Sequence, residues 1–163
     1  MSLENKSLQN INTGILPKDA CIVIVHTQWN TSIVNKLVEG CVSVLKELEM
    51  KNFKFVQVPG AFEIPFSIKS IWESHAQKFE KPQVFIALGC VMRGETPHFE
   101  YISRAVTDGL MTLNLQLPVS VINGVLTVNN QQQADDRTGG SHGNKGAEAA
   151  FSALKMMELK YQY

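Results

Sequence analysis

The segment Gly89–His98 combines the residue types that bind an anion and move a proton. It follows the apolar run Val84–Leu88, turns through two glycines and enters a predicted helix at Thr96-Pro97. Proline is favoured in the first turn of a helix, and the free amides at a helix N-terminus form a site for phosphate. His98 would lie in that first turn, where a neutral imidazole could relay protons. An ordinary surface histidine is the competing interpretation.

Two further clusters offer contacts for a flat, hydroxylated ligand. In Pro59–Pro65, Gly60 allows close backbone approach, and the Glu63 carboxylate could accept hydrogen bonds from a polyol. Trp29 follows another apolar run, and an exposed indole is a stacking surface for a heteroaromatic ring. Taken alone, Glu63 is also explained as a carboxylate favoured by the helix dipole, and Trp29 as a core residue.

The charged residues near the glycine-rich turn Thr138–Gly143 are candidates for a phosphate contact rather than a metal site. Arg137 and Lys145 bracket this turn, and either could neutralise a phosphate. Solvated basic residues are the more common case. Asp135-Asp136 has no His or Cys at ligand spacing, so we predict a solvated turn there and no metal site. The cysteines have no visible base partner, which argues against a Cys nucleophile.

Strands that alternate with helices must position these clusters. The predicted strands are Cys21–His26, Phe53–Val58, Val84–Leu88 and Val119–Leu126, and the predicted helices are Asn30–Glu49, Ile64–Lys78, His98–Leu115, Gln131–Arg137 and Asn144 to about Lys160. This order predicts a three-layer α/β/α sandwich with a four-stranded parallel sheet and right-handed crossovers. Because ligands of such sheets bind at the carboxyl ends of the strands, the clusters should form one composite site.

Composition limits the function classes. A chain of 163 residues predicts one domain, here residues 20–163, preceded by a loose arm, residues 1–19. The formal net charge is zero and no basic run exists, which excludes the electrostatic footprint of a nucleic-acid binder. No apolar stretch is long enough for a membrane span or a signal peptide. Three cysteines without paired spacing favour reduced thiols and a cytoplasmic location.

Three strings, in order, carry a resemblance to a known family. They are Val58–Pro65 (VPGAFEIP), Leu88–Tyr101 (LGCVMRGETPHFEY), and the region from Gly124–Thr127 (GVLT) to Gly143–Gly146 (GNKG). Together they resemble 6,7-dimethyl-8-ribityllumazine synthase over about residues 21–159. The resemblance implies a flavodoxin-like fold and a transferase of riboflavin biosynthesis that needs no cofactor. This enzyme would condense 5-amino-6-(D-ribitylamino)uracil with 3,4-dihydroxy-2-butanone 4-phosphate.

The same resemblance assigns roles to individual residues. His98 matches the proton-transfer residue, and Asn123 matches a position supplied by the adjacent subunit. The ribitylaminouracil site is expected to comprise Trp29, Ala61, Phe62, Glu63, Cys90, Val91, Met92 and Asn123, and the butanone phosphate site Glu95, Thr96 and Arg137. This chain departs from many family members at Trp29, Cys90 and Asn123, where Phe, Thr and an apolar or aromatic residue are common.

The resemblance also implies partners. Family members form pentamers with sites between neighbouring subunits, and often a shell of twelve pentamers, sixty subunits in all. The link Arg137–Gly146 shows no insertion, which favours the shell, and riboflavin synthase is a possible enclosed partner. The alternatives are a non-catalytic flavin or lumazine carrier, a structural container protein, and a flavodoxin-like electron carrier. The electron carrier is disfavoured because Thr27–Asn30 is a poor phosphate-binding loop.

Overall fold

A parallel four-stranded sheet forms the centre of the molecule. The computed structural model describes residues 11–75 and 80–163. The strands are β1 (Ile22–Thr27), β2 (Phe53–Val58), β3 (Val84–Met92) and β4 (Ser120–Val128). They lie in the order β2-β1-β3-β4, and each neighbouring pair is parallel. The predicted fold class is therefore confirmed.

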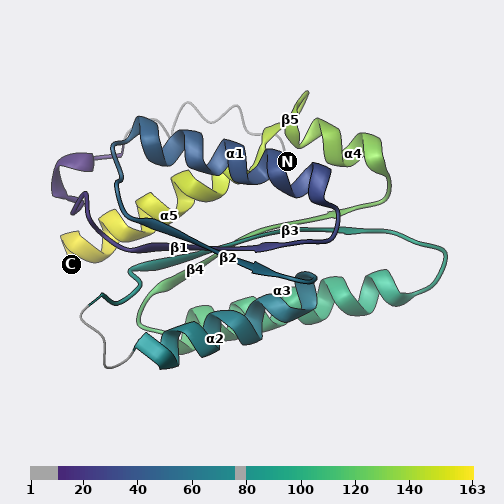
Figure 1. Ribbon diagram of the computed structural model, residues 1–163, viewed down its shortest axis with the longest axis horizontal. Coiled ribbons are helices and arrows are strands. Elements are labelled where there is room, and N and C mark those ends of the chain that lie inside the picture. The colour runs from purple at the N-terminus through teal and green to yellow at the C-terminus, as the bar shows by residue number, and fades with distance from the viewer. Residues whose placement is uncertain (1–10, 76–79) are drawn as a thin grey trace.

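Helices cover both faces of this sheet, as Figure 1 shows. One layer contains α1 (Thr31–Glu47) and α5 (Lys145–Gln162), and the other contains α2 (Ile64–His75) and α3 (His98–Gln116). Alternate residues of β1 point to opposite layers. Ile22 and Ile24 join the core under α1 and α5, whereas Val23 and Val25 join the core under α2 and α3. This two-sided burial explains the continuous apolar runs in the sequence.

The prediction that the third strand ends at Leu88 is wrong. β3 continues to Met92 because β4 is equally long, and the two strands remain paired up to Met92 and Val128. Gly89 therefore lies inside a strand, where a Cβ atom would stand 3.1 Å from Cγ2 of Thr27. Its role is close packing rather than a turn.

The other boundaries shift by a few residues. The helix predicted over Ile64–Lys78 is observed as α2 to His75, and the rest of that prediction lies outside the described residues. The first ten residues of the predicted arm also lie outside them. The part of the arm that is described packs on the domain: Leu16 is buried, and the Asn12 amide donates to Oε1 of Glu158 at 3.3 Å.

A short helix and two short strands connect the end of β4 to α5. Helix α4 (Gln131–Asp136) leads into β5 (Thr138–Gly140) and β6 (Gly143–Asn144), which pair antiparallel where the sequence predicted only a turn. Asn144 caps α5, since its Oδ1 accepts from the Gly146 and Ala147 amides at 2.8 and 3.1 Å.

Helices α1 and α5 approach each other at Gly146. A Cβ atom there would stand 1.9 Å from the Leu37 carbonyl oxygen, so only glycine permits this contact. Among the helices of residues 11–75 and 80–163, none has an apolar stretch long enough to cross a membrane.

Candidate active site at the carboxyl ends of β1 and β3

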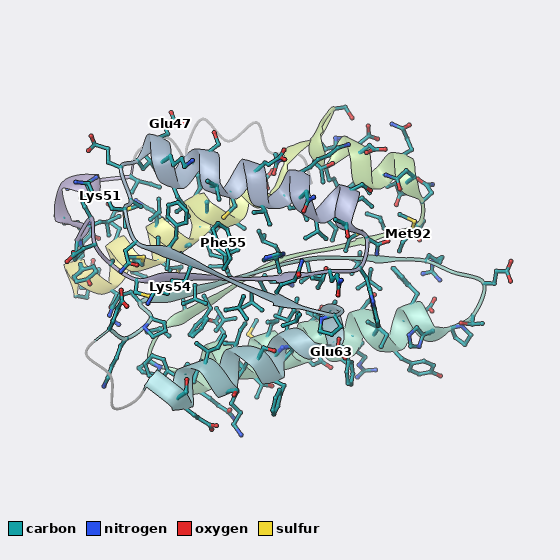
Figure 2. The ribbon with its side chains drawn as sticks, in the orientation of Figure 1. Glu47, Lys51, Lys54, Phe55, Glu63 and Met92 are labelled. Carbon is teal, nitrogen blue, oxygen red and sulfur yellow. The ribbon has the colours of Figure 1, made fainter. Side chains whose placement is uncertain are left out.

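A cavity of about 240 Å³ opens where β1 and β3 end. Its walls come from four segments: the β1–α1 turn, the short helix η3 (Ala61–Glu63), the end of β3 and the start of α3. The lining residues are Thr27, Trp29, Asn30, Ala61, Phe62, Cys90, Val91, Met92, His98 and Ile102. The cavity thus joins residues of three predicted clusters from segments far apart in the sequence, whereas Arg137 and Lys145 do not line it. Figure 2 shows Glu63 and Met92 toward the same end of the sheet.

Two larger hollows, of about 590 and 600 Å³, lie at the opposite end of the strands. Both are lined by Gln83, which precedes β3. Ligands of open α/β sheets bind at the carboxyl ends. The smaller cavity is also lined by the indole of Trp29, the phenyl ring of Phe62 and the imidazole of His98. It is therefore the better candidate for chemistry.

Trp29 forms one wall of the cavity and is 64% exposed, so it is not a core residue. Its turn is fixed by backbone bonds to the end of β2: the Gln28 amide donates to the Val58 carbonyl at 2.8 Å, and the Trp29 amide to the Pro59 carbonyl at 3.0 Å. The indole lies directly on Gly60, where a Cβ atom would stand 2.5 Å from Cε3. An aromatic surface held open to solvent suits a stacked ligand.

Glu63 is held at the entrance of α2 by the backbone. Its Oε2 accepts a hydrogen bond from the Gly60 amide at 3.0 Å. Ala61 is buried beside it, and Phe62 is 57% exposed. Oε2 is thus engaged by the backbone, and Phe62 offers an apolar surface next to this carboxylate.

Arg93 organises the loop between β3 and α3. Its amide donates to the Val128 carbonyl at 2.9 Å, its Nε to Oδ1 of Asn129 at 2.8 Å, and its guanidinium lies 4.3 Å from the centre of the Phe99 ring. It also pairs with Glu100, and this hydrogen bond lowers the pKa of the Glu100 carboxyl. Arg93 therefore holds the loop in which Glu95 and Thr96 are exposed, and His98 begins α3 directly after it.

The Cys90 side chain is unsuited to nucleophilic chemistry. It is buried, and burial raises the pKa of its thiol to about 11, so the thiol stays protonated near neutral pH. This agrees with a contribution from the backbone of Cys90–Met92 rather than from the sulfur. Over residues 11–75 and 80–163, His, Cys, Asp and Glu do not gather in groups of three or more that could hold a metal ion.

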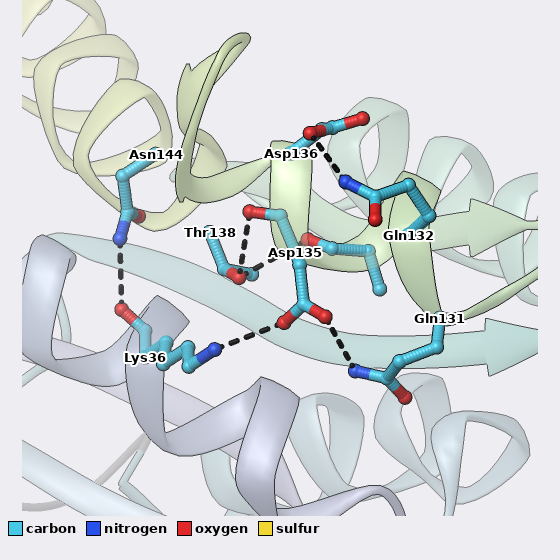
Figure 3. Close-up of polar contacts among 8 residues, drawn as sticks. Lys36, Gln131, Gln132, Asp135, Asp136, Thr138 and Asn144 are labelled. Atoms are coloured by element: carbon cyan, nitrogen blue, oxygen red, sulfur yellow. Dashed lines mark hydrogen bonds and ion pairs between the residues drawn. The ribbon is translucent and has the colours of Figure 1, made fainter.

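Arg137 does not line this cavity. It follows α4, and its Nη1 donates to the Gln133 carbonyl at 3.0 Å. The segment that carries it is tied to α1, as Figure 3 shows: Lys36 Nζ lies 2.9 Å from Oδ1 of Asp135, and Asn144 Nδ2 donates to the Lys36 carbonyl at 2.9 Å. The hydrogen bond from Lys36 lowers the pKa of Asp135. Arg137 is thus attached to a segment with defined contacts.

Asn123 also lies away from the cavity. It is on β4, the edge strand, and lines two shallow hollows on either side of that strand. Its Oδ1 accepts from the Val125 amide at 3.0 Å. Among the predicted residues, a single chain therefore places seven around the cavity: Trp29, Ala61, Phe62, Cys90, Val91, Met92 and His98. Glu63, Glu95, Thr96, Asn123 and Arg137 do not line it.

Three residues that line the cavity were given no individual role from the sequence: Thr27, Asn30 and Ile102. Thr27 and Asn30 lie in the segment Thr27–Asn30 that follows the first predicted strand, and Ile102 is one of several apolar residues of an amphipathic helix. Asn30 occupies the N-cap position of α1 without a side-chain cap hydrogen bond, and its Nδ2 donates to the Cys90 carbonyl at 2.9 Å. No local pattern indicates this contact with Cys90.

The family described as 6,7-dimethyl-8-ribityllumazine synthase matches residues 19–161. The chain belongs to this family. Among its curated relatives, the 6,7-dimethyl-8-ribityllumazine synthase of Parabacteroides distasonis is 40% identical over 158 residues, which cover 96% of each chain. That of Porphyromonas gingivalis is 43% identical over 145 residues, 88% of this chain and 87% of the relative. That of Phocaeicola vulgatus is 42% identical over 139 residues, 84% of this chain and 80% of the relative.

The lumazine synthase match includes every element that builds the cavity. It also includes β4, which carries Asn123, and the α4–β5 segment that carries Arg137. The family assignment therefore rests on the whole domain, and the residues that lie apart from the cavity are part of the matched region.

Proposed function

We propose that the chain is a transferase that forms 6,7-dimethyl-8-ribityllumazine. It would condense 5-amino-6-(D-ribitylamino)uracil with 3,4-dihydroxy-2-butanone 4-phosphate and release phosphate and water, in the penultimate step of riboflavin biosynthesis. The observation that carries this proposal is the cavity at the carboxyl ends of β1 and β3, which joins Trp29, the Cys90–Met92 strand end and His98 in a member of this family.

The first substrate fits the apolar part of the cavity. Its pyrimidine would stack on the exposed Trp29 indole, and its polar edge would meet backbone groups of Cys90, Val91 and Met92. Its ribityl chain would lie along Ala61 and Phe62 toward Glu63. The turn that carries the indole and the strand end are both held by the protein's own hydrogen bonds and close packing.

The second substrate would place its phosphate at the start of α3. Glu95 and Thr96 lie in the exposed loop before this helix, whose free amides favour an anion. The substrate amine attacks the ketone to give an imine between the two substrates, so no enzyme lysine is consumed. His98 would relay protons as phosphate leaves and the ring closes. Much of the rate would come from holding both substrates in register.

Asn123 and Arg137 would act from a second copy of the chain, in a homopentamer with sites between subunits. Two observations support this. Both residues lie apart from the cavity, and the open edge of β4 is flanked by exposed apolar side chains on α3 and α5, namely Met111, Leu115, Met156 and Leu159. A face of this kind is typical of an interface.

The larger assembly follows from the same proposal. The short β5–β6 connection carries no insertion, which favours a shell of twelve pentamers over free pentamers. Riboflavin synthase would be the candidate partner inside such a shell. We place the enzyme in the cytoplasm and treat residues 20–163 as its single domain. The family match and the names of the relatives do not support a non-catalytic carrier.

One assay tests the activity. Purified protein is mixed with both substrates, and lumazine formation is followed by absorbance against a blank without enzyme, because the two substrates react slowly unaided. The same assay is repeated with EDTA. A rate above the blank that EDTA does not change is the expected result. A rate equal to the blank from folded protein would overturn the proposal.

A further inference from the structure

Asn30 has an unusual backbone conformation for its place in the chain. Its φ of 58° and ψ of 41° lie in the left-handed region, and among the described residues other than glycine only Glu49 shares a positive φ. Asparagine tolerates this region better than most residues. This conformation lies at the start of α1, directly after Trp29.

The side chain of Asn30 forms a hydrogen bond to β3 at a point where β3 has no neighbouring strand on its β1 side. The paired residues of β1 and β3 end at His26 and Leu88, while β3 continues to Met92 against β4 alone. Beyond Leu88, β3 therefore has no strand on its β1 side. Asn30 Nδ2 donates there to the Cys90 carbonyl at 2.9 Å, which joins the β1–α1 turn to the end of β3.

Besides the backbone bonds to Val58 and Pro59, three other contacts act on the same turn. The Thr27 hydroxyl donates to the Trp29 carbonyl at 3.3 Å, and the Thr31 hydroxyl donates to the Gln28 carbonyl at 2.5 Å. The indole itself lies on Gly60, with no room for a Cβ atom between them. Of these contacts, only the Asn30 bond connects the turn that carries Trp29 to β3, the opposite wall of the cavity.

We propose that Asn30 is a positioning residue that fixes the separation between the Trp29 indole and the Cys90–Met92 strand end. It would thereby determine the affinity for the flat heteroaromatic substrate. This inference rests on the proposed function for the identity of that substrate. Because these contacts are made by the protein itself, they would set the width of the slot between indole and strand end, and the ligand would not have to order the turn.

Three variants separate the backbone from the side chain. Asn30→Gly keeps access to the left-handed region and removes the bond to Cys90. Asn30→Asp keeps the size of the side chain and replaces the donor with a carboxylate that repels the carbonyl. Asn30→Ala removes the bond and strains the turn. As a control, Asn52→Gly removes Nδ2 hydrogen bonds to the Asp19 carbonyl at 2.9 Å and to Oε1 of Glu80 at 2.6 Å, at the opposite end of the sheet.

Steady-state kinetics provide the first measurement. Loss of one hydrogen bond should raise KM for the ribitylaminouracil by about three- to tenfold in Asn30→Gly, and more in Asn30→Asp and Asn30→Ala. The kcat and the KM for butanone phosphate should stay within about twofold, since the lost interaction holds the ground state and transition state equally. Asn52→Gly should leave both KM values unchanged.

Fluorescence provides a second measurement that does not depend on activity. The chain has two tryptophans, so a Trp72→Phe background leaves Trp29 as the only indole. Time-resolved anisotropy in this background should show a larger fast component in Asn30→Gly and Asn30→Asp than in the parent and in Asn52→Gly. Thermal unfolding of each variant confirms that it is folded.

The outcomes are distinct. Increased Trp29 motion with a selective rise in KM supports the proposal. Unchanged anisotropy overturns it, and so does increased motion with KM unchanged, or an equal rise in KM for both substrates in folded protein. If the parent itself shows no synthase activity, the proposed function fails. The anisotropy comparison would still decide whether Asn30 positions Trp29.

Discussion

The methyl group added by Gly60→Ala should lower kcat/KM without destabilising the fold. Gly60 has φ −137° and ψ 179°, an extended conformation that alanine adopts freely. The Gly60→Ala change therefore strains no backbone, and it should stabilise slightly by restricting the unfolded chain. Its only large clash is with Trp29, where the new Cβ would stand 2.5 Å from Cε3 and 2.6 Å from Cζ3.

The size of the effect follows from this distance. Carbon atoms in contact are normally about 3.5 Å apart or more, so the indole must retreat by about 1 Å. Trp29 is 64% exposed, and it can move into the cavity rather than distort the core. A misplacement of about 1 Å can cost up to about 100-fold in rate. We expect kcat/KM to fall by about 10- to 100-fold, or about 1.4–2.7 kcal/mol, with Tm unchanged or slightly higher.

The test compares Gly60→Ala in two backgrounds. Lumazine formation is measured for Gly60→Ala, Trp29→Ala and the double variant, together with the Tm of each. If the effect acts through the indole, Gly60→Ala should cost almost nothing once Trp29 is alanine, so the double-mutant cycle should show strong coupling. Parental kcat/KM in Gly60→Ala, or the same loss in both backgrounds, would refute this reasoning.

Three further predictions concern the proposed chemistry. His98→Gln should lower kcat by about 100-fold with small changes in either KM, as expected for a proton-transfer residue; unchanged kcat at neutral pH would exclude that role. Arg137→Ala should raise KM for butanone phosphate by about 10- to 100-fold through loss of charge-assisted hydrogen bonds, with partial recovery in Arg137→Lys; an equal rise in KM for the ribitylaminouracil would contradict a phosphate contact. Cys90→Ala should keep kcat/KM within about threefold. Because burial raises the pKa of the Cys90 thiol to about 11, alkylation should be slow at pH 7 and accelerate as the pH rises toward that value; rapid alkylation at pH 7, with loss of activity, would show a reactive thiol.

The sheet and the location of the site could be predicted from the sequence because both depend on local patterns. Continuous apolar runs mark strands that are buried on both faces, and strand ends in a parallel sheet meet at one edge. The end of β3 could not be predicted, because Cys90–Met92 stays in the sheet only through pairing with β4. That pairing depends on the length of β4, which begins at Ser120, 32 positions after the predicted strand end at Leu88.

The contacts that shape the cavity could not be predicted from the sequence, for a related reason. The role of Asn30 depends on a carbonyl 60 positions away, which no local pattern reveals. Conversely, Asn123 and Arg137 were grouped with the cavity residues by family resemblance, although one chain holds them apart from it. Their proposed roles depend on the geometry between two subunits, which the sequence of one chain does not encode in any local motif.

The contact between α1 and α5 limits how this chain can change by mutation. The atom that blocks a side chain at position 146 is the Leu37 carbonyl oxygen, a backbone atom, so no rotamer change elsewhere can make room. Helix α1 begins beside Trp29, and α5 begins beside the segment that carries Arg137. A substitution at Gly146 would therefore shift two distant parts of the molecule relative to each other in one step. At surrounding core positions, one apolar residue can replace another in single substitutions. At position 146, any side chain would collide with the backbone of α1, so no single substitution is tolerated.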